Sequence, residues 1–65
     1  MLDPLSATEL RLIPLIAEGL SNREVGLRLD ISEQAVATHL SHILRKLGLR
    51  NRVQVAVWAV KQELY

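Results

Sequence analysis

Cysteine and phenylalanine are absent from this sequence, and no apolar run approaches the roughly 20 residues that cross a bilayer. The lack of cysteine excludes a disulfide framework and any metal site built on thiolates. A chain of 65 residues has only a small core, so dense helix packing or association with another chain must stabilise it. The first residues lack the basic and apolar regions of a signal peptide. We therefore expect an intracellular protein without membrane contact.

Acidic residues are also absent from positions 34–62, although the formal net charge of the whole chain is only +1. Six of the seven acidic residues precede that stretch. The stretch itself contains the basic residues Arg45, Lys46, Arg50, Arg52 and Lys61. This asymmetry indicates an anionic partner for the second half of the chain.

What the sequence does contain is a series of four helix starts. Ser6, Ser21 and Asn51 each precede a glutamate or glutamine by three residues, which is the spacing of a capping box. Ser32 is a fourth N-cap candidate. Glycines follow the first and third predicted helices, and no alternating run indicates a strand. The sequence therefore predicts an all-α fold, a compact four-helix domain that occupies residues 1–65.

The second predicted helix is short and contains Gly26, where alanine would be about 1 kcal/mol more favourable. We expect this glycine to allow a close approach to a neighbouring helix. The third predicted helix, about 33–47, has the clearest periodicity. Its apolar stripe consists of Val36, Leu40, Ile43, Leu44 and Leu47, and its opposite face of Gln34, Ala37, Thr38, Ser41 and Arg45. A face that is small and polar, then basic, suits a helix that enters the major groove of DNA.

The last predicted helix, about 52–62, is apolar nearly all round. A terminal helix can bury only one side against its own chain, so the second apolar side predicts contact with another copy. The predicted homodimer interface consists of Val53, Ala56, Val57 and Val60. Exposed valines without a partner are the alternative explanation.

Three stretches of the sequence resemble the LuxR-type helix-turn-helix, and most of all the effector domains of NarL/FixJ-type bacterial response regulators. These stretches are 18–25, 31–40 and 43–49, and the likeness extends over about 5–62. The resemblance implies a bacterial, cytoplasmic domain that regulates transcription. It also implies that the third helix reads the major groove, the second braces it and the fourth forms the dimer contact. Family members usually carry an N-terminal receiver or sensing domain.

The predicted function is sequence-specific binding of double-stranded DNA by a homodimer. The residues expected to read bases are Gln34, Ala37, Thr38 and Ser41. The residues expected to bind phosphates are Asn22, Arg23, Arg45, Lys46 and Arg52. Family members usually have lysine at the position of Ala37, so this reading face is unusually neutral and one copy should bind weakly.

Two other functions remain open. The basic face could bind an acidic protein, in a module for protein interaction or dimerisation. An enzyme has little support: His39 and His42 could share a metal, but no cysteine or acidic ligand stands at helical spacing beside them. We expect His39 to be packed and hydrogen-bonded, and His42 to face the surface or a phosphate. The chain is therefore expected to have no catalytic residue, no metal and no cofactor.

Overall fold

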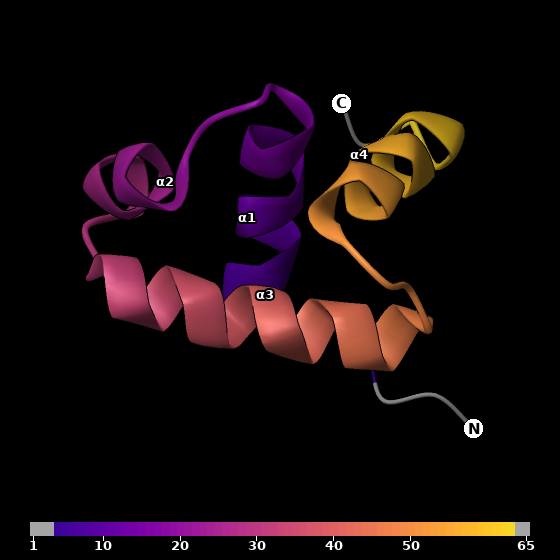
Figure 1. Ribbon diagram of the computed structural model, residues 1–65, viewed down its shortest axis with the longest axis horizontal. Helices are drawn as coiled ribbons and strands as arrows, with labels where there is room; N and C mark the ends of the chain where they lie inside the picture. Colours follow the sequence, from indigo (N-terminus) through magenta and orange to yellow (C-terminus); the bar gives the residue numbers. More distant parts are fainter. Residues whose placement is uncertain (1–3, 64–65) are drawn as a thin grey trace.

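The computed structural model describes residues 4–63, which form four α-helices and no strand. The longest helix, α3, lies along one side of the molecule, and α1 stands against its middle, between α2 and α4 (Figure 1). This arrangement confirms the predicted all-α, four-helix fold. The helix bounds are α1 (Ala7–Ala17), α2 (Asn22–Leu29), α3 (Glu33–Leu47) and α4 (Arg52–Lys61). The third helix has its predicted bounds, whereas α4 ends one residue earlier than expected because Gln62 is its C-cap.

The first three helices begin at the predicted serine N-caps. In both predicted serine capping boxes the hydroxyl accepts from the third helical N–H and the glutamate accepts from the serine N–H. The two distances are 3.2 and 2.9 Å for Ser6 and Glu9, and 3.1 and 2.9 Å for Ser21 and Glu24. Ser32 caps α3 with a hydroxyl that accepts a backbone hydrogen bond of 3.0 Å. Each cap satisfies an amide group that the helix leaves without an intrahelical partner.

The predicted box at the start of α4 is only half formed. Asn51 Oδ1 accepts from the N–H of Gln54 at 3.0 Å, but Gln54 Oε1 accepts from the N–H of Arg50 at 2.7 Å instead of that of Asn51. The backbone explains the difference, because φ is −156° at Asn51 and −74° at Ser6. This rotation turns the Asn51 N–H away from the Gln54 side chain. The Gln54 carboxamide oxygen accepts from the N–H of Arg50, the residue before Asn51, instead.

The core lies where α1 meets the other three helices. Among the described residues, nine hydrophobic side chains are buried, and four of them belong to α1. The buried residues are Leu12, Ile13, Leu15, Ile16, Val25, Val36, Ile43, Val55 and Ala59. The three leucines of the predicted α3 stripe and Trp58 are half-buried and pack against this cluster. Burial of apolar surface around α1 thus holds α2, α3 and α4 together on one core.

Gly26 explains the sharp turn between α2 and α3. The N–H of Ile31 donates to the Gly26 carbonyl at 2.9 Å, and Asp30 between them has a left-handed backbone with φ 60°. A Cβ placed on Gly26 would lie 2.6 Å from the Ile31 carbonyl oxygen. The predicted close approach is therefore present, but it is made with the backbone of the turn and not with the body of a helix.

Within residues 4–63, none of the helices has both the length and the apolar character that crossing a membrane requires.

Candidate nucleic-acid interface

The outer face of α3 is a row of exposed side chains. Gln34, Thr38, Ser41 and Arg45 are all exposed, and Ala37 is half-buried beside them. The Thr38 hydroxyl donates to the Gln34 carbonyl at 3.1 Å, so the helix itself orients this side chain while its oxygen can still accept a hydrogen bond. The four predicted base-reading residues and Arg45 therefore share one face, and only its last member is charged.

The start of α2 is tied to the start of α4. Arg52 Nη1 donates to Asn22 Oδ1 at 2.9 Å, and Arg52 Nη2 donates to the Leu20 carbonyl at 2.7 Å. Arg23, the next residue of α2, is exposed. The predicted phosphate ligands Asn22 and Arg52 are thus in direct contact. The carboxamide N–H groups of Asn22 and the first backbone N–H groups of α2 are donors that can still be directed to an anion.

Lys46 does not join this group, because its side chain turns towards α1. Its ammonium lies 2.8 Å from Glu9 Oε1 and donates to the Pro4 carbonyl at 3.2 Å. The Lys46 side chain is 17% exposed and that of Glu9 only 3%. A cation that the sequence assigned to phosphate therefore neutralises a buried carboxylate of its own fold. Nothing in the local sequence marks a pair that is 37 residues apart.

Hydrogen bonds lower the pKa of two glutamates. Burial alone raises the pKa of Glu9, but the hydrogen bonds from Lys46 and from Ser6 outweigh this effect, and the net pKa lies below its ordinary value. The pKa of Glu24 is also lowered, by the hydrogen bonds from the backbone and hydroxyl of Ser21. Both glutamates are thus held as carboxylates at the first turns of α1 and α2, where the helix dipole also favours negative charge.

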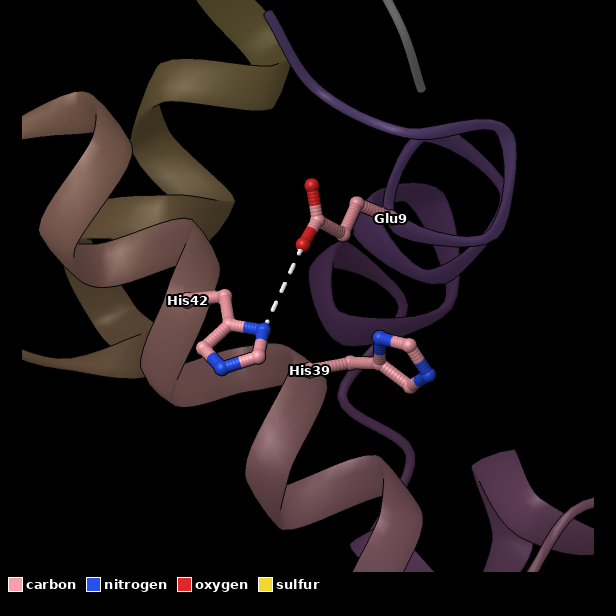
Figure 2. A group of neighbouring side chains, drawn as sticks. All are labelled: Glu9, His39 and His42. Atoms are coloured by element: carbon pink, nitrogen blue, oxygen red, sulfur yellow. Dashed lines mark ion pairs between the residues drawn. The ribbon is translucent and has the colours of Figure 1, made fainter. Parts of the chain in front are cut away.

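Glu9 also brings an acidic group to the two histidines of α3. One potential ligand atom from each of Glu9, His39 and His42 lies within 4.8 Å of the other two, and His42 Nδ1 is 3.8 Å from Glu9 Oε2 (Figure 2). Helical spacing places no acidic residue beside the histidines on α3, but the fold brings Glu9 to them from α1. His39 is packed as predicted, but the predicted hydrogen bond is not found at its buried Nδ1, which has no partner among the described residues. The His42 side chain is 41% exposed, as expected for a surface residue.

The predicted dimer residues form an exposed stripe along α4. Val53, Val57 and Val60 are 68%, 49% and 60% exposed, and Ala56 beside them is half-buried. The opposite side of α4 packs into the core. This helix is thus apolar on both sides: one side is buried in the core, and the side with the three valines is exposed in the single chain.

The helices and these surfaces define a four-helix domain in which α2, a tight turn and α3 make a helix-turn-helix. The chain belongs to the luxR family of bacterial regulatory proteins, whose family model matches residues 3–59. This membership confirms the family resemblance of the sequence. It identifies the chain as a DNA-binding domain of the kind found in transcription regulators, and not as an enzyme.

Known relatives agree with this assignment. The nitrate/nitrite response regulator protein NarL of Escherichia coli (strain K12) is 38% identical over 63 residues, which cover 97% of this chain and 29% of NarL. The oxygen regulatory protein NreC of Staphylococcus aureus (strain JH9) is 40% identical over 60 residues, or 92% of this chain and 28% of NreC. The crystal structure of the response regulator ChrA in a heme-sensing two-component system matches with a TM-score of 0.86 and 43% identity, over 97% of this chain and 31% of ChrA. The chain thus spans less than a third of each of these proteins.

Proposed function

We propose that this domain binds one specific double-stranded DNA sequence as a homodimer, and that it is the output domain of a two-component response regulator with an N-terminal receiver domain. The observation that carries the proposal is the exposed row of α3, which presents short polar side chains and then a cation on a helix braced by α2. The names of NarL and ChrA as response regulators support the receiver domain.

The chemistry of the row suits the edges of base pairs in the major groove. Gln34 can make two hydrogen bonds to adenine, and the hydroxyls of Thr38 and Ser41 can donate to or accept from any base. The methyl groups of Ala37 and Thr38 can contact a thymine methyl. Arg45, about three helical turns from Gln34, lies where the groove gives way to the phosphate backbone.

The start of α2 provides the phosphate contacts of the proposal. Asn22 and Arg23 offer side-chain and backbone donors at a helix N-terminus, and Arg52 places a second guanidinium behind Asn22. We leave Lys46 out of these contacts because Glu9 already binds its ammonium. With few cations at the interface, each copy neutralises only about three to five phosphates, and a single domain binds weakly.

Pairing of two copies through α4 would increase this affinity. Val53, Val57 and Val60 recur at intervals of four and three residues, so they lie on one side of the helix, next to Ala56. An apolar stripe of this kind matches the same stripe of a second copy related by a two-fold axis. Two recognition helices would then contact two half-sites of the DNA.

Selection of bound sites from random duplexes tests the proposal directly. We expect an enriched site with two-fold symmetry and a fixed half-site spacing, bound with an affinity that falls steeply with salt. Val57→Glu should remove the preference for paired half-sites, because it places a charge in the apolar stripe, while Lys61→Glu, a charge reversal on the same helix, should retain it. An unenriched pool, or enrichment of single half-sites by the wild-type chain, would contradict the proposal.

Binding of an acidic protein by the basic face is the second candidate, and the basic character of residues 34–62 favours it. Competition separates the two functions. A DNA reader keeps its preferred duplex in a large excess of random duplex, whereas a binder of acidic surfaces is displaced equally by any polyanion.

A further inference from the structure

Three side chains with metal-ligating atoms meet where α1 contacts α3, and none of them is among the residues proposed to contact DNA. Glu9 comes from the first turn of α1, and His39 and His42 come from successive turns of α3. Figure 2 shows the two imidazoles side by side on the part of α3 that is next to Glu9. Their ring planes are nearly perpendicular, at 88°, with centroids 6.4 Å apart. Two rings in this arrangement can direct nitrogens to a common point.

The hydrogen bonds of Glu9 fall unequally on its two oxygens. The Lys46 ammonium and the Ser6 N–H both donate to Oε1, at 2.8 and 2.9 Å. Oε2 instead faces His42 Nδ1 at 3.8 Å, which is longer than a hydrogen bond. The carboxylate is therefore fixed in orientation through one oxygen, while the other is directed to the histidines. Metal-binding carboxylates are typically oriented by second partners in this way.

His39 supplies an independent indication of a ligand. Its Nδ1 is buried and has no hydrogen-bond partner among residues 4–63. A buried nitrogen without a partner is unfavourable unless it binds something else. Glu9 Oε2 is an acceptor, and each neutral imidazole also presents a lone pair at Nδ1 in the tautomer that carries its proton on Nε2. A cation is a partner that three such lone pairs can share.

We propose that Glu9, His39 and His42 bind a divalent transition-metal ion, for which zinc is the best match. Two imidazoles and one carboxylate form a common zinc ligand set, with a fourth position for water. Bonds of about 2.0–2.1 Å place tetrahedral ligands roughly 3.3 Å apart, so small rotations of the side chains close the present separations of up to 4.8 Å. The half-exposed His42 gives the ion a route from solvent.

The ion would join the first turn of α1 to the middle of α3. It would act mainly on the stability of the helix-turn-helix, because it joins α1 to α3 through residues that are not among those proposed to contact bases, although His42 is a helical neighbour of Thr38 and Arg45. The proposal therefore does not depend on the DNA function. The Lys46 ammonium on the same carboxylate repels the ion and limits the affinity.

Zinc-dependent thermal stability tests the site. The chain is purified without a polyhistidine tag, freed of metal, and melted with and without excess zinc. We expect Tm to rise by roughly 5–10 °C at saturation in the wild-type chain. The rise should be lost in His42→Gln and in His39→Gln, and kept in Arg11→Ala, which alters an exposed residue of α1. The half-exposed position of His42 allows its variant to fold even where substitution of the packed His39 does not.

Two further measurements distinguish a built site from weak binding by surface histidines. Cobalt in place of zinc should give the visible absorption of a tetrahedral complex at one ion per chain. Lys46→Gln should increase zinc affinity roughly tenfold, because it removes the opposing charge. No zinc-dependent rise of Tm, a rise that survives His42→Gln, or octahedral cobalt would each overturn the proposal, and so would an unchanged affinity in Lys46→Gln.

Discussion

Arg52 at the start of α4 donates to Asn22 at the start of α2, with 2.9 Å between Nη1 and Oδ1. The same guanidinium donates to the Leu20 carbonyl at 2.7 Å, so one side chain joins α4 to the loop that precedes α2. Asn22 and Arg52, which were expected to contact phosphate independently, are thus hydrogen-bonded to each other. In the proposed interface, Arg52 would therefore also hold Asn22 in position.

Arg52→Ala should lower the free energy of unfolding by about 1–3 kcal/mol, because it removes two charge-assisted hydrogen bonds and leaves the Leu20 carbonyl without this donor. Denaturant unfolding followed through Trp58 measures the loss. Arg52→Lys should recover only part of it, because an ammonium cannot reproduce the two contacts of the planar guanidinium. A lysine variant as stable as the wild type would show that charge alone matters here.

Lys46→Met should lower the free energy of unfolding by about 2–4 kcal/mol in metal-free protein, because it leaves the buried Glu9 carboxylate without a counterion. Adding Glu9→Gln to this variant should restore part of the stability, since the carboxamide can still accept from Ser6. A double-mutant cycle, measured by denaturant unfolding, gives the coupling free energy between Lys46 and Glu9. Additive losses would show that the ion pair contributes nothing beyond its separate side chains.

Gly26→Ala should destabilise the domain by about 2 kcal/mol, although alanine is the better helix former. The new Cβ would lie 2.6 Å from a backbone oxygen of the turn, which cannot move without opening the angle between α2 and α3. Gly48→Ala is the control: it meets no atom within 4 Å and costs about 1 kcal/mol through its φ of +68°. If the two variants unfold at the same denaturant concentration, contact with the turn is not the reason for Gly26.

The folded state holds the pKa of Glu24 below its ordinary value through the hydrogen bonds from Ser21. Glu24 therefore stabilises the fold above its unfolded pKa, and this contribution is lost as pH falls through the lower, folded pKa. Glu24→Gln keeps the acceptor but cannot titrate, so its stability should fall less than that of the wild type below the ordinary value of 4.5. Urea titrations at several pH values measure this difference.

Arg45→Ala and Gln34→Ala should have different effects on DNA binding. The arginine change should weaken binding to the selected site and to random duplex alike. It should also reduce the slope of log affinity against log salt concentration by about one. The glutamine change should cost about 1–3 kcal/mol on the selected site only and relax the preference at one base pair. Fluorescence anisotropy on both duplexes at several salt concentrations measures these effects. Equal losses on both duplexes for Gln34→Ala would remove it from the base-reading set.

Signals confined to one turn of helix were predictable from the sequence. The serine caps at Ser6, Ser21 and Ser32 need only partners within three residues, and the apolar stripe of α3 needs only a regular period. The second half of the Asn51 box was not predictable, because it depends on the φ angle that the preceding loop gives this residue. Sequence spacing showed where α4 is apolar, and the structure shows which side of it the core leaves exposed.

Contacts between distant residues were not predictable. Asn22 and Arg52 are 30 residues apart, and Glu9 is 37 residues from Lys46, so neither helical periodicity nor capping relates them. The histidines show the same limit. Helical spacing correctly gave no acidic residue beside them on α3, but tertiary packing brings Glu9 from α1. The metal site proposed above is therefore a product of the fold.

Glu9 takes part in two kinds of contact through the same oxygen. It accepts from Ser6 to complete the capping box and from Lys46 across the domain. A helix end normally frays independently of the rest of a protein, but the first turn of α1 cannot unwind without removing the partner of Lys46 from α3. We therefore expect the hydrogen-bonded amide protons here, those of Ser6, Glu9 and Leu10, to exchange with solvent about as slowly as those of the core, through global unfolding. One carboxylate thereby makes a terminal turn part of the cooperative unit.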